Sequence, residues 1–260
     1  MRSCKRPRED APLAGGLRGE AKRSQLYEAG DETAEPHPYE PIAATPAAVL
    51  LLEAPGAQLL EHDFRQHAAL LHAAAEECAP LLEQRPRVIM WGKEQAQPRD
   101  VGFFSDVTEG YAYAGRVMRA QPLAESMRQL LQVVNETFSS QFNGVLANRY
   151  RSGSDTVGSH SDSEIGLEPR AGVVALSLGA TRTFRVRSAA TKEILRDVPA
   201  REGFALQMRG DRFQKVFKHE IPAQLRVKEA RMSLTFRKHT TPTTPLGQAT
   251  AADGGALGRD

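Results

Sequence analysis

The sequence contains very little cysteine, with only Cys4 and Cys78 among 260 residues. Two cysteines exclude a disulfide framework and a thiolate zinc cluster, and they favour a reducing intracellular compartment. No apolar run approaches the roughly 20 residues that a membrane-spanning helix needs. We therefore expect a soluble protein that is neither secreted nor embedded in a membrane.

A large excess of charge of one sign is also missing. The 34 lysines and arginines are balanced by 32 aspartates and glutamates, which leaves a net charge of +2. This balance excludes a chain that binds polyanions over its whole length, as histones do. A nucleic-acid contact would have to come from a local cleft.

Large apolar residues are scarce at both ends of the chain. Such segments cannot bury enough surface to offset the entropy of ordering, so we predict flexible tails at 1–45 and 240–260 around one folded domain at 46–239. Lys5-Arg6-Pro7-Arg8 has two interpretations, a nuclear import signal or solvated tail charge.

The pattern of apolar residues changes along the folded domain. Apolar residues recur at three- and four-residue steps over 63–83 and from Pro122 to about 138, which predicts two amphipathic helices. Short β-rich runs follow at 144–150, 172–178, 182–186, 204–208 and 230–237. Helices followed by many short strands predict an α+β, mainly β fold, a jelly-roll-like barrel buttressed on one side.

Two histidines and an aspartate form a candidate metal site. On an extended backbone His160 and Asp162 point to the same face, and His219 is a candidate third ligand. Two histidines and one carboxylate suit non-haem Fe(II) with open coordination positions. The alternative for His160-Ser161-Asp162 is a surface turn.

The segment 231–237 alternates strictly between apolar and polar residues. Met232, Leu234 and Phe236 share one face, and the polar face carries Arg231, Ser233, Thr235 and Arg237. Two arginines inside a barrel need an anion, which a dicarboxylate would supply. The alternative is an amphipathic edge strand that faces water.

These pieces, in this order, resemble the AlkB family of Fe(II)- and 2-oxoglutarate-dependent dioxygenases. The resemblance runs from about 87 to 238 and implies a double-stranded β-helix of the jelly-roll or cupin type, with a core at about 140–239. The quoted motifs are Asn148-Arg149-Tyr150, His160-Ser161-Asp162-Ser163-Glu164, the run from Leu176 to Phe184, His219, and the run from Arg231 to Arg237.

The resemblance also implies roles for individual residues. His160, Asp162 and His219 would be the catalytic iron ligands. The 2-oxoglutarate ligands would be Asn148, Tyr150, Arg231, Ser233 and Arg237. Ser233 stands where the family often has Asn, so the cosubstrate would lose or shorten one hydrogen bond here. Ser163 stands where a second acid is common, so Glu164 is the expected acid near the substrate base; otherwise Glu164 is a solvated loop carboxylate.

The segment 87–93 reads as a hairpin with Met90 and the single tryptophan, Trp91, at its tip. In the duplex-DNA-repair branch of the family an intercalating finger occupies this place, so we predict that Met90 and Trp91 wedge into the base stack. The alternative is a tryptophan buried in the core.

A nucleotide-recognition lid is expected at about 86–120. Alternation places Tyr111 and Tyr113 on one face of a strand, where they would hold a flipped base, or else cover the helix at 122–138. Arg99 in the same segment is predicted to contact substrate.

The reaction implied by the resemblance is DNA repair by oxidative demethylation of 1-methyladenine and 3-methylcytosine. Fe(II), 2-oxoglutarate and O2 would be required, and formaldehyde, succinate and CO2 released. Two alternatives remain open: an RNA or protein demethylase or hydroxylase of the same family, and a non-catalytic nucleic-acid-binding module. We expect an intracellular monomer without membrane contact.

Overall fold

The computed structural model describes residues 48–90, 93–113, 116–162 and 170–239. The side chains at 89–90, 111–113 and 116–117 lie outside this description, as do both predicted tails. In the described part of the chain, no helix is long and apolar enough to cross a membrane.

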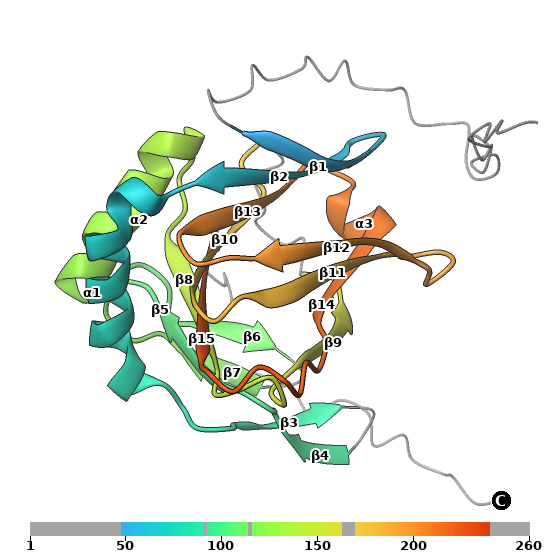
Figure 1. Ribbon diagram of the computed structural model, residues 1–260. Coiled ribbons are helices and arrows are strands. Elements are labelled where there is room, and N and C mark those ends of the chain that lie inside the picture. Colours follow the sequence, from blue (N-terminus) through green and yellow to red (C-terminus); the bar gives the residue numbers. More distant parts are fainter. Residues whose placement is uncertain (1–47, 91–92, 114–115, 163–169, 240–260) are drawn as a thin grey trace, which may run out of the picture. The chain divides into compact units, whose positions relative to one another are not determined.

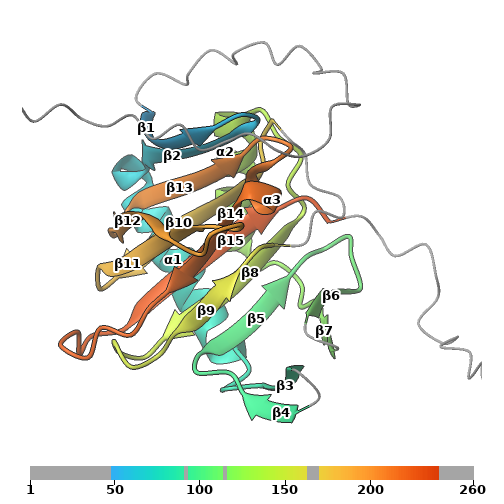
Figure 2. The ribbon, with the colours of Figure 1, turned by 90° about the vertical axis from the view of Figure 1, so that its right-hand side faces the viewer.

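Two antiparallel sheets form the core of the fold (Figures 1 and 2). The seven-stranded sheet contains, in spatial order, β1 (Val49–Ala54), β2 (Ala57–Asp63), β13 (Phe204–Arg209), β10 (Val173–Gly179), β15 (Arg231–Arg237), β8 (Gly144–Tyr150) and β5 (Asp100–Phe104). The four-stranded sheet contains β12 (Ile194–Ala200), β11 (Arg182–Ser188), β14 (Phe217–Ile221) and β9 (Val157–His160). This architecture confirms the predicted mainly β, jelly-roll-like fold.

The seven-stranded sheet buries both of its faces. One face packs against α1 (Ala68–Cys78) and α2 (Glu125–Phe138), where the helix residues Leu71, Leu130 and Val134 share one buried apolar cluster with the strand residues Leu234 and Phe236. A second apolar cluster fills the other side, between the two sheets. Its members include Leu206 and Met208 from β13, Phe184 and Val186 from β11, and Phe217 from β14. Because strand side chains alternate, β15 sends Met232, Leu234 and Phe236 toward the helices and its polar residues toward the second sheet.

Both predicted helices exist, with different ends. The first is an α-helix, α1, flanked by two 3-10 turns, η1 (Arg65–His67) and η2 (Ala79–Leu81). The second was predicted to begin at Pro122 but begins at Glu125. The reason is that the N–H of Leu123 donates to Oδ1 of Asp106 over 2.9 Å and Ala124 is extended, with ψ 164°, so the helical backbone begins only after Ala124.

Two hairpins lie beside the larger sheet, and the short α3 (Phe213–Val216) precedes β14. The strands β3 (Arg87–Met90) and β4 (Lys93–Ala96) pair with Met90 opposite Lys93, as expected for a hairpin at this place. The second hairpin contains β6 (Gly110–Tyr113) and β7 (Arg116–Arg119). Both hairpins fall in the segment predicted to form a lid.

Candidate active site

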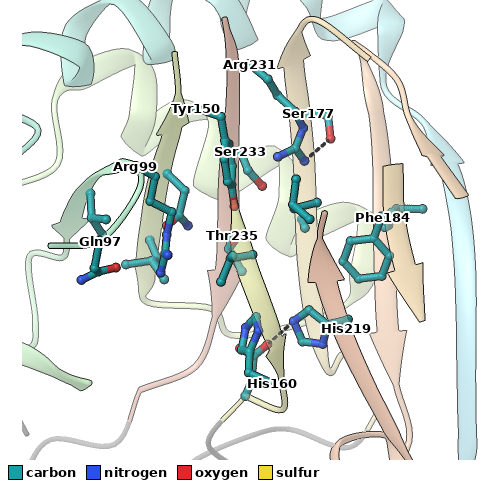
Figure 3. A pocket seen from close by; sticks show the side chains of 18 of the residues that line it. Gln97, Arg99, Tyr150, His160, Ser177, Phe184, His219, Arg231, Ser233 and Thr235 are labelled. Carbon is teal, nitrogen blue, oxygen red and sulfur yellow. Dashed lines mark hydrogen bonds and ion pairs between the residues drawn. The ribbon is translucent and has the colours of Figure 1, made fainter. Parts of the chain in front are cut away.

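A pocket between the two sheets collects most of the residues singled out from the sequence (Figure 3). His160 and His219 lie at one end of the close-up, and Arg231 with Ser177 at the other. The predicted site residues that line this pocket are Arg99, Asn148, Tyr150, His160, Asp162, His219, Arg231 and Ser233.

His160, Asp162 and His219 form the candidate metal centre. The pairing of β9 with β14 sets His160 directly opposite His219, and Asp162 follows two residues after His160. One ligand atom from each residue lies within 4.8 Å of the other two. The closest carboxylate oxygens of Asp162 are 3.7 Å from Nε2 of His160 and 3.9 Å from Nε2 of His219. Three ligands of this type on one side of a point leave the other side open for further ligands.

Neighbouring groups orient the three candidate ligands. Nδ1 of His160 lies 2.9 Å from the Gly158 carbonyl, which fits an Nδ1–H donor and leaves the Nε2 lone pair for a metal. The backbone N–H of Asp162 donates to Oε1 of Gln214 over 2.9 Å. The ring of Phe184 stacks on His219 with the centroids 5.2 Å apart and 16° between the planes. Each of the three residues is therefore held by at least one neighbouring group.

The electrostatics of the trio suit a divalent cation. Burial, together with the charge of His160, lowers the pKa of His219 to about 3, so this imidazole is neutral at pH 7. Burial alone would raise the pKa of Asp162, but electrostatic interaction with His219, His160 and Arg237 lowers it below its ordinary value. A neutral imidazole and an ionised carboxylate are the forms that bind metal.

Arg231 marks the opposite end of the pocket. Its side chain is 3% exposed, its Nη2 donates to Oγ of Ser177 over 3.0 Å, and its Nε and Nη1 have no hydrogen-bond partner. Its guanidinium carbon lies 5.3 Å from the ring centroid of Tyr150. Burial lowers the pKa of Arg231, yet an arginine remains charged at pH 7. Buried guanidinium donors without partners fit the carboxylate of a dicarboxylate such as 2-oxoglutarate.

The remaining predicted cosubstrate residues lie around these two ends. Ser233 and Asn148 are opposite each other across β15 and β8. Arg237 is 3% exposed and does not line the pocket, although its charge acts on Asp162. Arg99, predicted as a substrate contact, donates from Nε to Oδ1 of Asn148 over 2.8 Å.

Several pocket residues were not identified from the sequence. They are Gln97, Met118, Phe184, Ser177 and Thr235. Thr235 shares the polar face of the strand that was recognised, and Ser177 and Phe184 lie within a quoted motif. Gln97, by contrast, stands in a loop without periodicity, so no local pattern points to it.

Five predicted substrate contacts fall outside the description. Trp91 and Glu164 are outside the described residues, and for Met90, Tyr111 and Tyr113 only the backbone is described. Their roles remain predictions.

Comparison with known proteins places the pocket in context. The family model described as "2OG-Fe(II) oxygenase superfamily" matches residues 58–237. "DNA oxidative demethylase ALKBH2" is 29% identical over 58% of this chain in Homo sapiens and 30% identical over 58% in Mus musculus. "Alpha-ketoglutarate-dependent dioxygenase alkB homolog 3" of Homo sapiens is 32% identical over 54% of this chain. The matches span 60%, 66% and 51% of the three relatives' own lengths.

Proposed function

This chain belongs to the 2OG-Fe(II) oxygenase superfamily, and from that premise we propose that it is an AlkB-type dioxygenase that demethylates alkylated bases in DNA. The observation that carries the proposal is one pocket with the His160, Asp162 and His219 trio at one end and the unpartnered donors of Arg231 at the other. Curated relatives named as a DNA oxidative demethylase support the choice of substrate.

The residues at the two ends of the pocket have different proposed roles. His160, Asp162 and His219 would hold Fe(II), while Arg231, Tyr150 and Asn148 would orient 2-oxoglutarate. Fe(II) with 2-oxoglutarate and O2 supplies an oxidant able to hydroxylate a methyl group on nitrogen. The apolar lining, which includes Phe184 and Met118, limits the access of water to the reacting methyl group.

The proposed substrates are 1-methyladenine and 3-methylcytosine. Hydroxylation of the N-methyl group gives a hemiaminal, which releases formaldehyde and leaves the unmodified base, while 2-oxoglutarate becomes succinate and CO2. Both lesions are cationic, which suits a site with an acid and aromatic faces. For that reason we retain Glu164, Tyr111 and Tyr113 as proposed base contacts, and Arg99 as a contact at the pocket wall.

We further propose that Met90 and Trp91, at the tip of the β3–β4 hairpin, fill the gap left by the flipped base. Replacing Trp91 by Ala would then reduce activity on duplexes more than on single strands. Equal losses on both would favour single-stranded DNA or RNA as the substrate.

The direct test loads the protein with Fe(II) and 2-oxoglutarate without O2, and then adds O2 and a duplex oligonucleotide that carries 1-methyladenine. The expected result is an oligonucleotide lighter by one methyl group with matching succinate, and no product with His160→Ala. Succinate without demethylation would move the search to RNA or protein substrates. Absence of both succinate and the demethylated oligonucleotide would refute the proposal that this protein is a dioxygenase.

A further inference from the structure

Gln97 contributes an unexplained polar group to the pocket. It lies in the loop between β4 and β5, where its backbone N–H donates to the Pro86 carbonyl over 2.9 Å. The residue is 5% exposed, and its side-chain Oε1 has no hydrogen-bond partner. In Figure 3 it stands beside Arg99, on the wall across the pocket from Phe184.

The other unpartnered atoms of the pocket have an assigned use. Oδ2 of Asp162 and Nδ1 of His219 belong to the metal trio, and Nε and Nη1 of Arg231 belong to the anion end. Gln97 lies on the side wall, away from both ends of the pocket, and comes from the lid segment rather than from the strands that carry those residues. A buried acceptor without a donor costs about 1–3 kcal/mol, so a ligand that donates to it gains affinity. The ligand group that reaches this wall would be the substrate base.

The hydrogen-bonding groups around Gln97 favour a substrate base that donates a hydrogen bond. Arg99 and Arg231 already supply donors to this pocket, whereas the Gln97 oxygen supplies an acceptor. 1-Methyladenine and 3-methylcytosine both carry an exocyclic amino group beside the methylated ring nitrogen, and an amino group donates. 3-Methylthymine carries carbonyls on both sides of its methylated nitrogen. 1-Methylguanine carries a carbonyl at C6, where 1-methyladenine has its amino group, and its own amino group lies on the other side, at C2. In both bases a carbonyl at that place would set two acceptors against each other.

We propose that Gln97 is a specificity-determining residue, whose side-chain oxygen accepts a hydrogen bond from the exocyclic amino group of the methylated base. This inference rests on the proposed function and deepens it, since it names the lesions that the site prefers. It also means that the choice between methylated bases depends on the loop before β5 rather than on the residues proposed to hold the metal or the cosubstrate.

The test compares three proteins on single-stranded oligonucleotides that carry one of the four lesions. Gln97→Met keeps the length of the side chain but removes the acceptor, and Gln97→Glu keeps an acceptor in either orientation of the side-chain head group. Gln95→Met is the matched control, because Gln95 is an exposed glutamine on β4. The readouts are kcat/KM for each lesion and the KM for 2-oxoglutarate.

For Gln97→Met we expect kcat/KM on 1-methyladenine and 3-methylcytosine to fall about tenfold relative to 1-methylguanine and 3-methylthymine. Gln97→Glu should keep the wild-type preference, and the KM for 2-oxoglutarate should stay within about twofold in both variants. Equal losses on all four lesions, or no change on any, would overturn the inference while the demethylase remains. If the wild-type protein demethylates none of the four, the proposed function fails and the inference fails with it.

Discussion

Nε of Arg99 donates a hydrogen bond to Oδ1 of Asn148 over 2.8 Å, and both side chains are buried. Arg99 immediately precedes β5, and Asn148 lies on β8, the strand that pairs with β5. Because Oδ1 accepts from Arg99, the side-chain amide of Asn148 is oriented with Nδ2 as its remaining donor. The contact therefore links the predicted lid segment to the strand proposed to bind 2-oxoglutarate.

Arg99→Met should raise the KM for 2-oxoglutarate about fivefold, because the amide of Asn148 loses the hydrogen bond that orients it. Steady-state kinetics with 2-oxoglutarate as the varied substrate measures this effect. Arg119→Met, at an exposed arginine on β7, serves as the control and should leave that KM unchanged. A change confined to the KM for the oligonucleotide would show that Arg99 acts on the base alone.

Arg231→Lys should weaken the binding of 2-oxoglutarate at least about tenfold. The lysine keeps the charge but loses the planar pair of donors that matches a carboxylate. Calorimetric titration of the metal-loaded protein with 2-oxoglutarate in the absence of O2 gives the affinity directly. Arg226→Lys, in an exposed loop, is the matched substitution, and similar affinities in the two variants would contradict the assignment of Arg231.

Metal binding should stabilise the folded protein through the trio. Mn(II), which binds such sites without starting the reaction, should raise Tm by about 5–10 °C at a concentration 100-fold above its Kd. His219→Ala should abolish this increase, whereas His72→Ala, at an exposed histidine on α1, should retain it. Thermal unfolding followed with and without Mn(II) tests the site independently of activity.

Arg182 is fully buried and ties two loops together. Its guanidinium donates to the carbonyls of Ser152, Asp155 and Pro222 over 2.8–2.9 Å. Arg182→Met should lower the free energy of unfolding by about 3 kcal/mol, because the carbonyls of Asp155 and Pro222 lose the guanidinium donor and that of Ser152 keeps only the N–H of Asp155.

Arg185→Met supplies the comparison for Arg182→Met on the same strand. Arg185 is partly exposed and pairs with the exposed Asp197 over 2.7 Å, so its replacement should cost no more than about 1 kcal/mol. Urea unfolding of the two variants measures the difference. Equal losses would mean that the buried hydrogen bonds of Arg182 contribute little to stability.

His239 should make the protein less stable in mild acid. Burial, reinforced by the charge of Arg237, lowers its pKa from 6.5 to about 3. As the pH falls below 6.5 the unfolded chain takes up a proton that the folded chain does not, so stability decreases, by about 2 kcal/mol at pH 5. His239→Gln should remove this part of the change between pH 7 and pH 5 in urea unfolding, and His72→Gln should not. An unchanged slope in His239→Gln would contradict the assignment.

The metal-binding and anion-binding residues of the site could be predicted because the sequence patterns that indicate them are local. The alternation along 231–237 assigns Arg231 and Ser233 to one face whatever the neighbouring strands are, and His160 and Asp162 share a face for the same reason. The predicted start of α2 was wrong because Leu123 bonds to Asp106, which is distant in the chain. The strands β1 and β12 were missed because their edge positions leave many residues exposed, which blurs the apolar pattern.

By itself, the sequence determined which side chains could bind a metal or an anion. It also determined which face of a strand they share, because successive side chains of a strand point to opposite faces. Only the tertiary structure decided that β9 pairs with β14 and sets His160 against His219, that Arg99 orients Asn148, and that Gln97 enters the pocket. These relationships depend on the order of strands in two sheets. That order follows from packing between distant segments, which no local pattern contains.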